Sequence, residues 1–173
     1  AGLPQRIVPI PYPCPNEIYE ARMGEAVASA VREGITHMIF GDLFLTDIRA
    51  YREARLAGTG ITPVFPLWEL PTPELAGAMI ESGLQAYLAT VDLKKLPEEF
   101  AGRRFDAHLL ADLPDGVDPC GENGEFHTCV VDGPMFSRAL SVETGERVMR
   151  DGYAYCDLVL TRSAEPRQAR AAR

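Results

Sequence analysis

Residues 61–73, ITPVFPLWELPTP, place four prolines within thirteen positions and constrain the fold more than any other segment. Proline lacks a backbone N–H, and its ring clashes with the preceding helical turn, so the segment cannot form an α-helix. The residue before each proline is also restricted to extended conformations. We therefore expect an extended crossover that divides the chain into a first domain over residues 1–68 and a second over residues 69–160.

The composition indicates a globular protein. The chain has 173 residues, of which 46% are hydrophobic, and this is enough for a real core. No run approaches the roughly 18 apolar residues that a membrane span needs, and the first residues do not resemble a signal peptide. These features predict a cytoplasmic protein without a membrane partner.

Charge and cysteine content narrow the function classes. The net charge of −8 repels phosphate polymers, so we expect no nucleic-acid partner. The four cysteines form no CxxC pair, which argues against a zinc ribbon and against a disulfide framework. Residues 161–173 are rich in arginine without apolar periodicity, and we predict a disordered basic tail there.

The first domain is predicted to begin with a strand, a helix and a second strand. The strand RIVPIP covers residues 6–11, the helix covers residues 16–34, and the strand THMIFGD covers residues 36–42. Such a unit makes its two strands parallel, and parallel sheets bind ligands at the carboxyl ends of their strands. Gly41 and Asp42 lie at such an end, where a simple turn and helix cap is the alternative interpretation.

A second helix is predicted from Thr46 to Leu56. Arg49, Arg52 and Arg55 recur every three residues and therefore share one helix face. Two interpretations stay open: a solvated face of ion pairs, or an anion-binding wall near Asp42.

The second domain reads as α+β. A helix is predicted over residues 72–83, a strand over residues 84–92, and a further helix around residues 105–113. Short, partly antiparallel strands then follow, with a tight turn at residues 144–146, TGE.

Residues 120–128, CGENGEFHT, are the most polar stretch of the second domain. If residues 124–131 are extended, Glu125, His127 and Cys129 share one face, which would be costly to bury without a partner or ligand. The preceding glycines, Gly121 and Gly124, allow backbone amides to turn toward a ligand. Glu122 and Asn123 supply acceptors and a donor, so the stretch suits a ligand with an amine or carboxamide.

Three other interpretations of this stretch remain open. Cys120, His127 and Cys129 could form a zinc site, although they lack a regular ligand pair. A cysteine could act as a nucleophile with His127 as its base. The stretch could also be a purely structural polar turn.

The chain resembles the ATP-pyrophosphatases of the diphthine-ammonia ligase family, which belong to the adenine nucleotide α-hydrolase superfamily. The resemblance rests on GDLFLTDIRAYRE, FPLW, CGENGEFHT and DGPMF, which occur in this order up to about Leu160. The family's hallmark is an acid-glycine-glycine-acid-aromatic-acid-threonine run. Asn123 replaces one glycine of that run and His127 replaces one acid, while its other hallmark positions are kept: Glu122, Gly124, Glu125, Phe126 and Thr128.

The resemblance implies an α/β fold, with a partial parallel-sheet nucleotide-binding (HUP-like) domain followed by a smaller α+β domain. It implies that ATP, with Mg²⁺, activates a carboxylate as an acyl adenylate, after which ammonia forms an amide. The carboxylate substrate can be carried on a protein. The implied roles are catalytic for Glu122, Glu125 and His127, substrate-binding for Asn123, Gly124, Thr128 and Arg49, and nucleotide-binding for Gly41 and Asp42.

One departure from the family bears on activity. The family's phosphate-binding loop, of the type serine-glycine-glycine-lysine-aspartate-serine, does not occur in the 173 residues. We therefore interpret the chain as an amino-terminally shortened member that binds ATP poorly by itself. The alternative is a noncatalytic binding module. In either case we predict that Asp42 and the Glu122 run face one shared cleft, and we leave open whether the protein is a homodimer.

Overall fold

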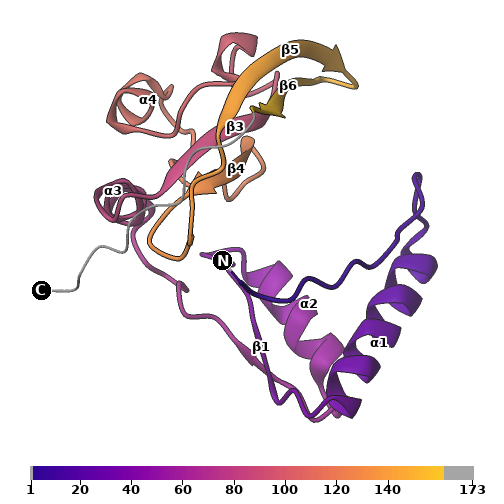
Figure 1. The fold of residues 1–173 in the computed structure, drawn as a ribbon. Helices are drawn as coiled ribbons and strands as arrows, with labels where there is room; N and C mark the ends of the chain where they lie inside the picture. The colour runs from indigo at the N-terminus through magenta and orange to yellow at the C-terminus, as the bar shows by residue number, and fades with distance from the viewer. Residues whose placement is uncertain (1, 162–173) are drawn as a thin grey trace, which may run out of the picture. The chain divides into compact units, whose positions relative to one another are not determined.

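The computed structural model describes residues 2–161, which form two compact units (Figure 1). The first unit is Leu3–Glu69 and the second begins at Leu70. The first contains a small parallel sheet and the second an antiparallel sheet, and helices accompany both. The predicted α/β class is therefore confirmed.

The first unit contains α1 (Asn16–Arg32), β1 (His37–Ile39), α2 (Thr46–Leu56) and β2 (Thr62–Val64). Its two strands pair in parallel, with His37 opposite Thr62 and Ile39 opposite Val64. The helix α2 is the crossover between them, so the βαβ unit begins at the second predicted strand and not at the first. A parallel pair of this kind requires such a crossover connection.

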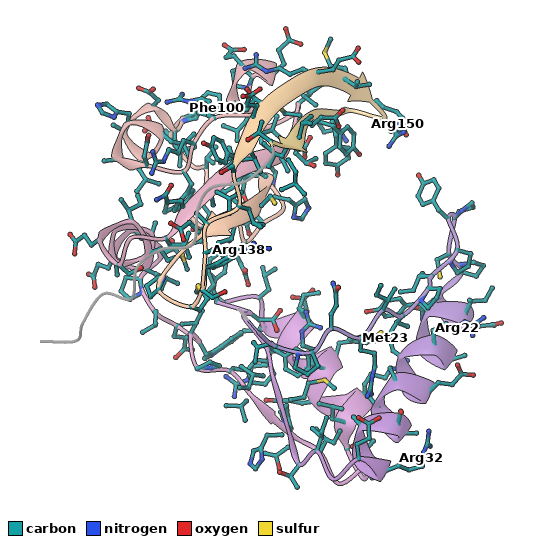
Figure 2. The ribbon with its side chains drawn as sticks, viewed as in Figure 1. Arg22, Met23, Arg32, Phe100, Arg138 and Arg150 are labelled. Atoms are coloured by element: carbon teal, nitrogen blue, oxygen red, sulfur yellow. The ribbon has the colours of Figure 1, made fainter. Side chains whose placement is uncertain are left out.

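The strand predicted at residues 6–11 is wrong, because this segment is neither helix nor strand. Pro9 and Pro11 lie within or at the end of it and cannot donate to a sheet ladder. The segment that follows is equally rich in proline up to Pro15, where α1 begins. On α1 itself, Met23 faces α2, whereas Arg22 and Arg32 project away from it (Figure 2).

The second unit contains three helical and four strand elements among the described residues. They are α3 (Thr72–Glu81), β3 (Gln85–Asp92), the 3₁₀ helix η1 (Glu98–Phe100), α4 (Ala107–Asp112), β4 (Phe126–Asp132), β5 (Val142–Arg150) and β6 (Tyr153–Leu160). The strand order is β4-β3-β6-β5, and every neighbouring pair is antiparallel. The helices predicted over residues 72–83 and near residue 109, and the strand over residues 84–92, are confirmed.

The core of the second unit is organised around β3. Leu88 and Val91 are fully buried, and Phe126 from β4 and Leu109 from α4 belong to the same cluster. The side chain of Phe100, labelled in Figure 2, joins this cluster from η1. A register shift between Leu88 and Thr90 moves the buried face from even to odd positions, as a β-bulge does.

The tight turn predicted at residues 144–146 is also wrong. The strand β5 continues through these residues, and its pairing with β6 shifts in register between Thr144 and Arg147, on either side of the glycine. The hairpin turn lies instead at Asp151 and Gly152, which have φ values of 54° and 84°. An aspartate-glycine pair with two positive φ values suits the two-residue hairpin turns that match strand twist.

We expect Leu88→Ala to lower the free energy of unfolding by about 2–5 kcal/mol, because it removes a fully buried side chain and leaves a cavity. Leu160→Ala in β6 is the matched control, because that leucine is 67% exposed and its loss should cost less than about 0.5 kcal/mol. Urea unfolding of both variants measures the difference. Equal effects of the two substitutions would contradict the assignment of the core to β3.

Candidate functional site

The hallmark loop, residues 118–125, consists of consecutive turns between α4 and β4. The backbone N–H of Gly121 donates to the carbonyl of Asp118 at 2.9 Å, and that of Gly124 donates to the carbonyl of Gly121 at 3.0 Å. The carboxylate of Asp118 accepts from the backbone N–H of Glu122 at 2.9 Å. Asp118 is 8% exposed, so this bond is formed away from solvent and holds the loop in one conformation.

Gly121 is required by both conformation and space. Its φ of +71° is in the left-handed region, and a Cβ built there would lie 2.9 Å from the carbonyl oxygen of Phe126. Gly124 also has a positive φ, of +77°, but a Cβ at that position would meet nothing within 4 Å. Only the first glycine is therefore needed for close backbone packing.

Glu125 is the buried acid of the site, with 1% of the residue exposed. Its Oε1 accepts from the side-chain amide of Asn123 at 3.0 Å and from the backbone N–H of Asp118 at 3.3 Å. The ammonium of Lys95 lies 4.0 Å from the same oxygen. The other oxygen, Oε2, is buried and has no hydrogen-bond partner among residues 2–161.

Two opposing effects act on the pKa of Glu125. Burial raises the pKa, and the effects that oppose burial are hydrogen bonds from its own backbone N–H, from Asn123 and from Asp118, with the charge of Lys95. Together these stabilise the carboxylate more than burial disfavours it, and the pKa lies below its ordinary value of 4.5. Glu125 is therefore ionised at neutral pH.

Lys95 connects this acid to an open hollow of about 460 Å³. Its ammonium donates to the backbone carbonyl of Asn123 at 2.8 Å. The hollow is lined by Lys94, Lys95, Asn123, Glu125 and the loop from Pro114 to Val117. The hollow lies entirely within the second unit, and Asn123 and Glu125 of the hallmark loop form one side of it.

His127 and Thr128 of the hallmark run lie on β4 and are exposed, whereas Phe126 on the same strand is buried. His127 pairs with Thr90 and Thr128 pairs with Leu88 in the antiparallel ladder. The strand begins at Phe126, so Glu125 precedes it and is buried while His127 and Cys129 are exposed. The three polar side chains therefore do not form the single environment that strict alternation predicts.

Cys120 has a pKa raised to about 11, first by burial and then by the negative charges of Asp118 and Glu122. A thiol in this state stays protonated at neutral pH and is a poor nucleophile. Within residues 2–161, no group of three or more histidine, cysteine, aspartate and glutamate side chains is placed to hold a metal ion.

Gly41, Asp42 and Arg49 belong to the first unit. Gly41 is exposed, and the carboxylate of Asp42 makes a two-pronged contact with the guanidinium of Arg52, at 2.6 and 3.0 Å. Such a bidentate arrangement, with two parallel hydrogen bonds, is stronger than a carboxylate–arginine contact through one hydrogen bond. The carboxylate of Asp42 is thus held by the second arginine of the predicted row.

Arg49 is held just as firmly. Its guanidinium lies 4.8 Å from the ring centre of Phe65 and 4.6 Å from that of Trp68, and it pairs with Glu53 at 2.9 Å. Arg55 pairs with Glu20 of α1. Each arginine of the row therefore has an acidic partner, as the ion-paired interpretation predicts, while substrate binding by Arg49 stays a prediction.

Asp118, Lys94 and Lys95 contribute to the site and were not predicted from the sequence. A signal was present for the lysines, because the chain has fifteen arginines but only these two lysines, next to each other after β3. Asp118 has no comparable signal, since an aspartate in a loop of this composition is ordinary. The shared cleft of Asp42 and the Glu122 run stays a prediction.

Comparison with known proteins now defines the class of this chain. Human diphthine–ammonia ligase is 30% identical to it over 110 residues, which cover 61% of the chain and 41% of the human protein. The zebrafish (Danio rerio) ligase is 31% identical over 101 residues, covering 55% of the chain and 39% of that protein. The Schizosaccharomyces pombe ligase is 29% identical over 103 residues, which are 17% of its length.

The match to a family is more extensive. The family described as the diphthamide synthase C-terminal domain matches residues 72–163, over half of the chain. The chain belongs to this family, and the resemblance predicted from the hallmark run is confirmed. The matched residues include the whole hallmark loop and both lysines, while the chain spans about two fifths of the vertebrate relatives or less.

We expect Gly121→Ala to be more destabilising than Gly124→Ala. Both substitutions force a side chain into the left-handed region, which costs about 1–2 kcal/mol. Only Gly121→Ala also drives a Cβ against the Phe126 carbonyl, so its loss of unfolding free energy should exceed that of Gly124→Ala. Urea unfolding of the two variants measures this difference, and identical losses would show that close packing at Gly121 is unimportant.

The lowered pKa of Glu125 predicts a pH dependence of stability. A carboxyl group with a folded pKa below its unfolded value stabilises the protein above about pH 4.5, and this stabilisation is lost as the pH falls through the folded pKa. The stability difference between the wild type and Glu125→Gln should therefore be largest near neutral pH and shrink in acid. Urea unfolding at a series of pH values tests this, and a constant difference would contradict it.

Proposed function

We propose that this chain is the substrate-binding part of an ATP-dependent ligase that converts a carboxylate into an amide with ammonia. The observation that carries the proposal is the family match across the hallmark loop, in which Glu125 is buried, ionised and anchored by Asn123. The printed name of the relatives states a diphthine–ammonia ligase. Diphthine and ammonia are accordingly the substrates to test first.

The residues of this chain are assigned to the substrate side of the reaction. Forming an amide from an activated carboxylate and ammonia releases one proton, so the site needs acceptors for N–H groups. Glu125 offers a buried, ionised carboxylate, and Glu122 and His127 lie near it in the chain. We propose that Glu125 orients the nitrogen, while Asn123, Gly124 and Thr128 shape the surface that receives the substrate.

ATP, with Mg²⁺, would supply the activation of the carboxylate, and we propose that Gly41 and Asp42 contact the nucleotide. The phosphate-binding loop is not present in the sequence, and Asp42 is occupied by Arg52. The proposed nucleotide contacts at Gly41 and Asp42 therefore require further residues around the phosphates, and we assign no step of the reaction to them.

A noncatalytic binding module is the second candidate. It is favoured by the engagement of the Asp42 carboxylate with Arg52. Calorimetry with ATP and Mg²⁺ on this chain and on a form extended upstream of Ala1 separates the two candidates. If the extended form binds ATP and releases pyrophosphate, the ligase is supported. If neither form binds ATP or releases pyrophosphate, the binding module is supported.

No helix among residues 2–161 is both long and apolar enough to cross a membrane. A cytoplasmic location, the lack of a nucleic-acid partner and the choice between monomer and homodimer stay predictions.

We expect Glu125→Gln to abolish amide formation in the extended form while the fold is retained. Glutamine has nearly the same shape but lacks the negative charge that receives N–H groups, so a loss of about 10²-fold or more is expected. Mass spectrometry of the amide product measures it.

Glu143→Gln is the control for this experiment, because it removes an exposed carboxylate on β5 of the same unit. It should leave amide formation unchanged. Normal turnover by a folded Glu125→Gln variant would rule out the role that we give to Glu125.

A further inference from the structure

The two lysines of the chain line one hollow together with the buried acid Glu125. Lys94 and Lys95 lie two and three residues after the end of β3, and the backbone N–H of Lys94 donates to the carboxylate of Asp92 at 2.9 Å. This bond fixes the turn that carries both lysines. Among residues 2–161, the ammonium of Lys94 has no ion pair or hydrogen bond, so its charge is available to a ligand.

The hollow also contains an unsatisfied acceptor. Glu125 lines it, and Oε2 of this carboxylate is buried without a hydrogen-bond partner among the described residues. An ionised oxygen left in this state is costly, because burial removes its hydration without replacing it. A donor that reaches Oε2 would therefore gain more than the same donor at an exposed carboxylate.

Because Glu125 is only 1% exposed, a ligand reaches its carboxylate only if neighbouring side chains move. Lys95 has 37% of its side chain exposed and Asn123 is exposed, and each is held by only one or two polar contacts. Both side chains contact the carboxylate at Oε1, and binding of a ligand would displace them from it. The hydrogen bonds to Oε1 from the Asp118 backbone remain in place.

The charges of the lining select the class of ligand. The two lysines favour an anionic group, whereas Glu125 and the exposed Asp115 favour a group with N–H donors. A phosphate would be repelled by the two carboxylates, and a simple amine would be repelled by the two ammonium groups. A small molecule with an amine and a carboxylate satisfies both halves of the lining.

We propose that this hollow binds the amino-carboxylate part of a substrate. Its carboxylate is held by Lys94 and Lys95, and its N–H donors are accepted by Oε2 of Glu125. This inference deepens the proposed function and rests on it for the identity of the bound molecule as a substrate. Binding itself requires neither ATP nor turnover.

The chain allows a direct test because selective labelling with [ε-¹³C]lysine gives only two side-chain signals. The full 173-residue chain is titrated with glycine, β-alanine and 4-aminobutyrate, which carry the same two charges at increasing separation. At least one should shift both signals saturably. Butyrate and butylamine, which each keep one charge, should bind at least about tenfold more weakly than 4-aminobutyrate or the tightest of the three.

Two variants locate the groups. Glu125→Gln should weaken the tightest amino-carboxylate at least about tenfold without weakening butyrate, because it removes the negative charge that attracts the amine and keeps both lysines. Lys94→Gln should weaken both, and it keeps the proposal testable if Glu125→Gln does not fold by circular dichroism. Glu143→Gln, outside the hollow, should change neither affinity.

Three results would overturn the inference: no saturable shift with any amino-carboxylate, butyrate binding as tightly as 4-aminobutyrate, or unchanged binding in folded Glu125→Gln and Lys94→Gln. Because no nucleotide is present, these results leave the ligase proposal standing. Conversely, saturable binding here, without amide formation by the extended form, would overturn the ligase proposal and retain the site.

Discussion

The burial of the Glu125 carboxylate is the constraint on which the architecture of the hallmark loop depends. A buried charge is costly unless hydrogen bonds replace its lost hydration. Here the replacements come from the Asn123 amide and the Asp118 backbone, with Lys95 nearby. These donors converge only because the loop turns tightly at Gly121, where any larger residue would strike the Phe126 carbonyl. The hydrogen bonds, the glycine and the charge therefore form one interdependent unit.

The core strand β3 connects this unit to the rest of the fold. The backbone N–H of Asp92, its last residue, donates to the carbonyl of Glu125 at 2.9 Å, and its side chain fixes the turn into Lys94. The acid and the lysines are thus anchored to the same strand end, which is itself held by the fully buried Leu88 and Val91. A rigid core strand places opposite charges on one hollow with little freedom to drift apart.

The first unit uses its charges differently. The arginines of α2 are held by acids and aromatic rings, with Arg52 on Asp42 and Arg49 between Phe65 and Trp68. Partners of both kinds fix a guanidinium more firmly than a single surface ion pair, which contributes little. Of the two residues proposed for the nucleotide side, Asp42 is therefore already engaged with an arginine of the same unit.

Local patterns in the sequence were sufficient to predict α1, α2, α3 and β3. Their apolar periodicity and their flanking glycine and proline residues act over a few neighbouring positions. The family resemblance was likewise readable, since the hallmark run is contiguous in the chain. Tertiary structure alone decided that Glu125 is buried while His127 is exposed, because the strand starts two residues later than the predicted extended segment. It also decided that Lys95 and Asp118 meet Glu125, because residues 30 and 7 positions apart are brought together by strand pairing and loop closure, which no local pattern encodes.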